Sequence, residues 1–272
     1  MSIKKYFTGM IVTVICLYAG LAMAGNIVIT GSTTVLPIAQ KVAEAYMSQN
    51  PDVKISISGG GSGEGIKALI DGTTSIADSS RFIKDSEIKQ AVDKGRYPVP
   101  FAIAYDCIVP VVHPSNTIVN LTVQQLKGIY KGEIKNWKEL GGPDKKIVVI
   151  SRDTSSGTYE VWEDKVMNKE KVTPAALMQA SNGAIVQAVF SNPNAIGYIG
   201  IGYVDSSLKT LMVDKVKASA ETALNGTFPI HRALYMFTSG WPKGDTLNFI
   251  NFMLNPQKGQ KYLKEEGFVP LY

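Results

Sequence analysis

Three segments of the chain join a short apolar stretch to a helical pattern through a turn rich in Ser, Thr and Gly. They are Ile29–Thr34, Ile57–Gly65 and Ile150–Thr158. The start of a helix leaves backbone N–H groups without partners and carries partial positive charge, so it favours an anion. Glycine allows close backbone approach, and hydroxyls add donors without adding charge. Each turn alone also fits ordinary helix capping, because Ser and Thr are favoured cap residues.

Considered together, the three turns favour an anion-binding site. Each follows a predicted strand, and in α/β proteins ligands bind in the crevice at the carboxyl ends of the strands. Arg152 opens the third turn, and its guanidinium could bind an oxyanion through two parallel hydrogen bonds. Asp153 either holds that guanidinium or serves as a turn acid. Arg81, in the run Asp78–Arg81, is either a second ligand charge or a member of a surface ion pair.

Motifs typical of enzymes are absent from the sequence. No G-x-x-x-x-G-K-[ST] or G-x-G-x-x-G motif occurs, so the glycines around Ser62 do not form a nucleotide-binding loop. Neither Ser62 nor Ser156 is flanked by the two glycines of a nucleophile elbow. His113 and His231 are the only histidines, too few for a histidine-rich metal site. The sequence therefore predicts a binding protein without cofactor or metal, not an enzyme.

The elements that position these turns alternate between strand and helix. Predicted strands are Asn26–Thr30, Lys54–Ser58, Ser75–Ala77, Ile147–Ile150 and Ala195–Ile199. Predicted helices are Val35–Asn50, Gly65–Ile70, Ser86–Lys94, Thr122–Tyr130, Gly157–Val166, Ser181–Phe190, Leu247–Leu254 and Pro256–Glu265. This alternation predicts βαβ units and a mostly parallel sheet with helices on both faces. Two longer extended runs, Tyr97–Val112 and Ile230–Thr238, are predicted crossovers between interleaved lobes.

Residues 1–24 have the pattern of a cleaved secretory signal peptide. Two lysines precede an apolar run, Met10–Leu21, and Ala22–Ala24 supplies an A-x-A cleavage site. The run is short for a membrane span. Lipid attachment at Cys16 is the alternative, but the residues before it lack the small side chain expected there. We expect export to the periplasm and release as a soluble protein.

The net charge and the cysteine content restrict the kind of protein that the sequence can encode. The net charge is +5, and removal of the two leader lysines leaves +3, which helps to attract an anion but is no nucleic-acid-binding footprint. Cys107 is the only cysteine after residue 24, so no internal disulfide can form. About 250 residues suffice for a large core in two lobes. We expect a monomer.

The turns resemble those of the phosphate-binding subunit of bacterial phosphate ABC transporters. Thr30–Pro37, Ser58–Lys67 and Arg152–Thr158 look like the three phosphate loops of that family, in the same order. The resemblance runs from Gly25 to the C-terminus and includes Asn194–Ile199.

This resemblance implies the α/β type II periplasmic-binding-protein fold, with two lobes joined by two crossover strands and the ligand in the cleft. Lobe I would comprise residues 25–104 and 232–272, and lobe II residues 105–231. The implied function is capture of inorganic phosphate by lobe closure and its delivery to an ABC permease in the membrane. The implied ligand residues are Ser32, Thr33, Thr34, Ser62, Ser156, Gly157 and Thr158, with Arg152 as charged partner and Asp153 as its orienter.

One position departs from the best-known members, in which an aspartate accepts the ligand's proton and so distinguishes phosphate from sulfate. An ungapped count places Ser80 there, followed by Arg81, and both are ligand candidates. A shift of two residues would instead make Asp78 the acceptor. Because serine cannot repel sulfate as a carboxylate does, a receptor for sulfate, molybdate or tungstate stays open. So do a phosphate sensor without transport and a secreted phosphatase-like enzyme.

Overall fold

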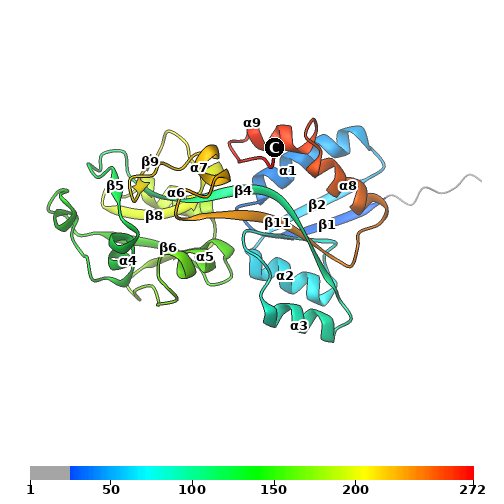
Figure 1. The fold of residues 1–272 in the computed structure, drawn as a ribbon, viewed down its shortest axis with the longest axis horizontal. Helices are drawn as coiled ribbons and strands as arrows, with labels where there is room; N and C mark the ends of the chain where they lie inside the picture. The colour runs from blue at the N-terminus through cyan, green and yellow to red at the C-terminus, as the bar shows by residue number, and fades with distance from the viewer. Residues whose placement is uncertain (1–24) are drawn as a thin grey trace, which may run out of the picture.

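The computed structural model describes residues 25–272, which form an α/β protein of two lobes (Figure 1). The predicted signal peptide, residues 1–24, lies outside the described residues. In the described part of the chain, no helix is both long enough and apolar enough to cross a membrane.

The first lobe is a parallel sheet with helices on both faces. Its strands are β1 (Asn26–Gly31), β2 (Lys54–Gly59) and β3 (Ile76–Ser79), with β1 in the middle. Its helices are α1 (Leu36–Gln49), α2 (Ser62–Asp71), α3 (Asp85–Asp93), α8 (Gly244–Leu254) and α9 (Gly259–Glu265). Consecutive residues of a strand face opposite sides, so Ile76 packs with α1, α8 and α9 while Ala77 packs with α2 and α3.

The second lobe repeats this design. Its parallel strands are β6 (Val148–Arg152), β7 (Leu177–Gln179) and β8 (Ala195–Gly200), with β6 in the middle. Its helices are α4 (Val123–Lys131), α5 (Gly157–Lys165), α6 (Asn182–Phe190) and α7 (Ala220–Leu224). Shorter elements are β5 (Asn120–Leu121), β9 (Lys209–Thr210), β10 (Met212–Val213), η1 (Trp137–Leu140) and η2 (Ile201–Tyr203). Trp162 of α5 stacks on Tyr198 of β8 with 4.1 Å between ring centroids.

Two long strands connect the lobes, as Figure 1 shows. β4 (Pro98–Val112) pairs with β11 (His231–Ser239) as far as Cys107 and with β8 from Ile108 onward. β11 also pairs with β3, so one sheet runs through both lobes in the order β2-β1-β3-β11-β4-β8-β6-β7. The predicted crossovers are confirmed.

The expectation of a mostly parallel sheet is correct within each lobe and wrong at the junction between them. β11 runs antiparallel to β3 and to β4, and β4 runs antiparallel to β8 and β9. The reason is the direction of travel: β4 leaves the first lobe and β11 returns to it, so the two neighbours point in opposite directions.

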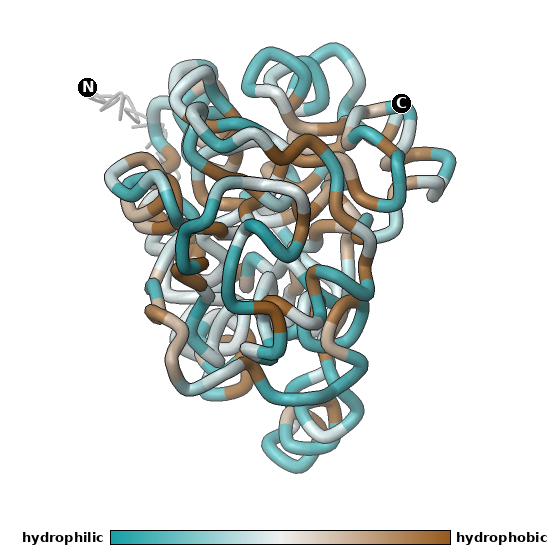
Figure 2. Tube along the Cα trace, turned by 90° about the vertical axis from the view of Figure 1, so that its left-hand side faces the viewer, coloured by the Kyte–Doolittle hydropathy of each residue, from teal (hydrophilic) through white to brown (hydrophobic). Residues whose placement is uncertain are grey.

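Each lobe has its own hydrophobic core. One buried cluster lies mainly among α4, α5, β4 and β8, and another lies among α1, α8, α9 and β1. Figure 2 shows hydrophilic residues along the loops at the top and bottom of the view and hydrophobic stretches further inside. Separate cores joined by two strands leave relative motion of the lobes compatible with the fold.

Candidate functional site

The three Ser/Thr/Gly turns lie at the carboxyl ends of β1, β2 and β6 and meet where the two lobes face each other. The Thr34 Oγ1 of the first lobe lies 3.0 Å from the Thr158 Oγ1 of the second. The Gly63 N–H donates to the Ser155 carbonyl at 2.9 Å, and the Ser155 Oγ lies 3.1 Å from the Gly60 carbonyl oxygen. Segments far apart in the sequence therefore form one polar layer between the lobes.

Ser62 and Ser80 belong to the same group. Their Oγ atoms lie 3.2 Å apart, and the Ser80 N–H donates to the Ser62 Oγ at 3.0 Å. Both face the start of α5: a Cβ added at Gly157 would lie 2.4 Å from the Ser62 Oγ and 2.8 Å from the Ser80 Oγ. Only glycine permits this approach between the lobes.

Local capping shapes the loops. Ser156 precedes α5, and its Oγ accepts from the N–H groups of Thr158 and Tyr159 at 3.2 and 3.3 Å. The Ser32 Oγ accepts from the Thr34 N–H at 3.1 Å in the first loop. The capping interpretation is thus correct for Ser156, whereas the Ser32 hydroxyl closes the turn before α1 without capping that helix. Both residues are buried among the facing loops. The seven loop residues of the predicted ligand set are all buried; they are Ser32, Thr33, Thr34, Ser62, Ser156, Gly157 and Thr158.

Arg152 carries the buried positive charge of the third loop. Its side chain is 1% exposed, and backbone carbonyls hold it: Nε donates to the Gln179 carbonyl at 3.1 Å and Nη2 to the Ala180 carbonyl at 3.0 Å. Nη1 is buried and has no hydrogen-bond partner among the described residues. Burial lowers the pKa of Arg152, opposed by the negative charge of Asp153. The guanidinium is fixed with one donor group still available.

Asp153 has two partners. Its Oδ1 accepts from the Ser155 N–H at 2.9 Å and also from the Ser155 hydroxyl, so it holds the shape of the third loop. Its Oδ2 lies 3.8 Å from the Arg152 Nη2, a long contact beside the carbonyls of Gln179 and Ala180. Asp153 thus forms its hydrogen bonds within the third loop and makes only a long ion-pair contact with the Arg152 guanidinium.

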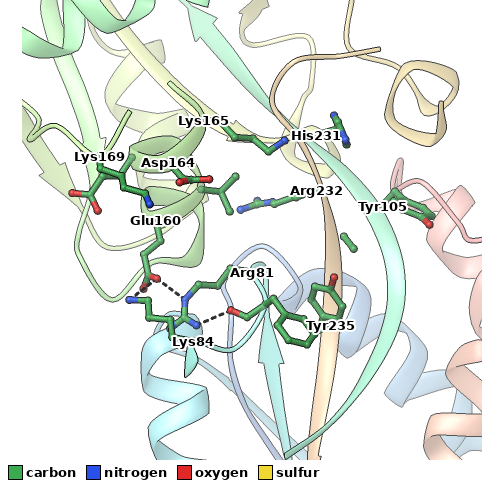
Figure 3. A pocket seen from close by; sticks show the side chains of 14 residues that line it. Arg81, Lys84, Tyr105, Glu160, Asp164, Lys165, Lys169, His231, Arg232 and Tyr235 are labelled. Carbon is green, nitrogen blue, oxygen red and sulfur yellow. Dashed lines mark hydrogen bonds and ion pairs between the residues drawn. The ribbon is translucent and has the colours of Figure 1, made fainter. Parts of the chain in front are cut away.

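Arg81 is engaged by carboxylates. Its Nη1 and Nη2 donate to the two carboxylate oxygens of Glu87 at 2.8 and 2.7 Å, and its Nε lies 2.7 Å from the Glu160 Oε2 (Figure 3). Of the two interpretations that the sequence left open, the geometry matches the ion pair. Arg81 is buried, however, and not at the surface as that interpretation expected, while Glu160 is half-buried. The pair joins the lobes, since Glu160 lies on α5.

Asp78 is fully buried beneath the first loop. Its backbone carbonyl accepts from the Ser32 N–H at 2.9 Å, and its Oδ1 has no hydrogen-bond partner among the described residues. Burial raises the pKa of Asp78 well above its usual range. Ser80, and not Asp78, contacts Ser62.

Comparison with known proteins identifies the family. A family model described as a PBP superfamily domain matches residues 18–257. The phosphate-binding protein PstS of Borreliella burgdorferi is 33% identical over 253 residues, covering 89% of this chain and 88% of that protein. PstS of Pseudomonas aeruginosa is 32% identical over 272 residues, covering 92% and 84%. The chain belongs to the PstS family of phosphate-binding proteins.

Solved structures match this PstS-family chain in three dimensions. A Clostridium perfringens protein with bound phosphate has a TM-score of 0.85 and 36% identity, covering 91% of this chain and 100% of the other. An ABC-type phosphate transport receptor from Vibrio cholerae has a TM-score of 0.74 and 34% identity, covering 89% and 99%. A phosphate-binding protein from Stenotrophomonas maltophilia, with 16% identity and a TM-score of 0.75, shares the fold.

Sequence reasoning missed three polar residues beside the loops of this PstS-family protein. The Asn182 Nδ2 lies 3.1 Å from the Thr34 Oγ1, and its Oδ1 accepts from the Gly200 N–H at 3.1 Å. Asp106 and Arg232 form a buried ion pair at 2.7 Å between the crossover strands β4 and β11. The available signal was a charged residue within each predicted crossover, and Asn182 directly after the Ser181 helix cap.

The chemistry of the site is that of hydrogen-bond donation. Hydroxyls, backbone N–H groups at a helix start and a fixed guanidinium suit an oxyanion removed from water. Within residues 25–272, no group of three or more His, Cys, Asp or Glu side chains is arranged to hold a metal ion. Cys107 is buried and unpaired, and burial raises its pKa to about 12, so the thiol stays protonated at physiological pH.

Proposed function

We propose that this chain captures inorganic phosphate between its lobes and delivers it to the permease of an ABC transporter. The observation that carries the proposal is the meeting of three donor-rich loops from both lobes beside the buried Arg152, whose Nη1 has no partner among the described residues. The relatives named phosphate-binding protein PstS, and the Clostridium perfringens structure with bound phosphate, support the choice of ligand and role.

The proposed ligand residues come from the loops that meet between the lobes. They are Ser32, Thr33, Thr34, Ser62, Ser80, Arg152, Ser156, Gly157 and Thr158. Asp153 holds the third loop. The family resemblance implies that Arg81 is a ligand residue. We propose instead that Arg81 links the two lobes through its ion pair with Glu160.

Capture occurs by lobe closure about β4 and β11. We place lobe I at residues 25–104 and 232–272 and lobe II at residues 105–231. In support, Ile103 and Ala104 pack in the first lobe's core, whereas Cys107 and Ile108 pack in the second lobe's core. We also propose that residues 1–24 direct export to the periplasm and that the released protein acts as a monomer, without cofactor or nucleic acid.

The role is binding and not catalysis. The loops offer donors that stabilise an anion without attacking it, and the protein should not hydrolyse p-nitrophenyl phosphate. Loss of phosphate uptake on gene deletion would support transport over a purely sensory role, since a sensor leaves uptake by the transporter in place.

Calorimetric titration tests the ligand. We expect phosphate to bind with micromolar or tighter affinity, roughly 8 kcal/mol or more. Sulfate, molybdate and tungstate should be titrated in parallel, because Ser80 presents a hydroxyl where a carboxylate would repel a fully ionised anion. Absence of heat with phosphate would refute the proposal, and tighter binding of another tetrahedral oxyanion would reassign the ligand.

A further inference from the structure

Arg232 lies at the start of β11 and is almost completely buried. Its side chain is 4% exposed, and its Nε and Nη2 contact the Asp106 Oδ2 at 2.8 and 2.7 Å. Asp106 is itself buried on β4, where its Oδ1 accepts from the Ile201 N–H at 2.9 Å. The ion pair therefore links the two crossover strands and fixes the plane of the guanidinium.

This guanidinium borders the donor loops. Its Nη2 lies 3.3 Å from the Thr34 Oγ1, the same hydroxyl that contacts Thr158 and Asn182 of the second lobe. Figure 3 shows the Arg232 side chain extending from β11 toward α5. The third loop leads directly into the first turn of this helix. Arg152 opens the third loop, whose Thr158 contacts the same Thr34 hydroxyl, so both arginines border the meeting point of the loops.

One donor group of Arg232 is unused. Its Nη1 is buried and has no hydrogen-bond partner among the described residues, as is true of the Arg152 Nη1. Buried charged donors are normally satisfied, because an unsatisfied one loses its hydration without replacement. Two such groups, on arginines that border the same loops of hydroxyl and N–H donors, call for an acceptor-rich anion.

We infer that Arg232 is a second arginine that hydrogen-bonds the bound tetrahedral oxyanion, through its Nη1, from the crossover strand β11. This inference rests on the proposed function. Asp106 balances the charge of Arg232, so the residue adds an oriented donor without adding net charge to the site. The anion would then touch the first lobe, the second lobe and the crossover at once.

The test separates ligand contact from charge balance. Arg232→Gln replaces the charged guanidinium by a shorter neutral amide but also leaves Asp106 as an unpaired buried carboxylate. The double variant Arg232→Gln/Asp106→Asn is the matched protein without that defect. By phosphate calorimetry we expect at least a tenfold loss of affinity in both, and partial recovery in Arg232→Lys, which keeps a charged donor. Asp106→Asn alone, with Arg232 intact, should lose less than the double variant.

If the double variant binds phosphate within about threefold of the wild type, Arg232 only neutralises Asp106 and the inference is wrong. A crystal structure of the wild type with phosphate decides the matter independently of how the variants fold. We expect Nη1 within about 3.2 Å of a phosphate oxygen; a separation too long for a hydrogen bond would overturn the inference. Failure of the wild type to bind phosphate would instead refute the proposed function.

Discussion

The Nε atom of Arg81 lies 2.7 Å from the Oε2 atom of Glu160, and the two residues belong to different lobes. The Lys84 Nζ contacts the same oxygen at 2.7 Å. Arg81 follows Ser80, and Glu160 lies one turn into α5 after Gly157, so the ion pair spans the cleft directly beside the donor loops. Its partners are 6% and 15% exposed, which reduces screening by salt.

Loss of this ion pair should weaken phosphate binding by favouring the open lobes. For Glu160→Gln we expect an affinity loss of about 1 kcal/mol, roughly fivefold, mostly as faster release. Stopped-flow measurement of phosphate release checks the rate. Asp164→Asn is the matched control, because Asp164 lies exposed on the same helix and its loss removes the same charge. Equal release rates in Glu160→Gln and the wild type would show that the Arg81–Glu160 ion pair does not hold the lobes closed.

Gly157→Ala should block close approach of the lobes. The added Cβ would lie 2.4 Å from the Ser62 Oγ, and overpacking of this kind costs about 1–3 kcal/mol. We expect at least a tenfold loss of phosphate affinity by calorimetry. Gly183→Ala, in the first turn of α6, is the control, since its nearest atom would be 3.9 Å away. Similar affinities in both variants would show that the Gly157 contact does not limit closure.

Arg152→Ala should cost at least about 2 kcal/mol of binding energy, about thirtyfold, because a desolvated anion loses a charged donor. Arg152→Lys should recover only part of this, since lysine cannot reproduce the planar fork held by the Gln179 and Ala180 carbonyls. The control is Arg96→Ala, which removes a partly exposed arginine after α3. If Arg152→Ala binds phosphate as tightly as the wild type, Arg152 is not a ligand residue.

Asp78→Asn should stabilise the protein at neutral pH. Because burial raises the folded-state pKa of Asp78, the unfolded chain releases a proton that the folded protein retains, and wild-type stability falls as pH rises above about 4. Asparagine does not titrate, so the variant should melt a few degrees higher at pH 7 and gain little at pH 4. Phosphate affinity should persist, since Ser80 occupies the loop position. Thermal melts of both proteins across this pH range check the prediction. A difference in melting temperature that does not change with pH would contradict it.

Local patterns predicted the donor loops because each loop is specified by its own few residues. Strand, turn and helix follow one another at Ile150–Thr158, and the carboxyl ends of parallel strands must meet at one edge. The sequence patterns did not predict the short strands β5, β9 and β10, because two residues are too few to show an alternating pattern.

Partners distant in sequence could not be predicted in this way. Glu160 reaches Arg81 only because α5 and the end of β3 face each other across the cleft. Arg232 reaches Thr34 only because β11 returns to lie between β3 and β4. Sequence spacing carries no information about either contact, so both arginines had to be placed by the fold.

The position of β11 between β3 and β4 also constrains how the molecule acquires its structure. Residues 107–230 form one uninterrupted stretch that supplies every buried residue of the second lobe's main core except Val269, so most of this core can form once the stretch is complete. The N-terminal strands cannot close their sheet until His231–Ser239 becomes available. During synthesis from the N-terminus, the β3 edge therefore stays exposed until β11 has been made, and we expect most of the second lobe to fold before the sheet of the first lobe is complete.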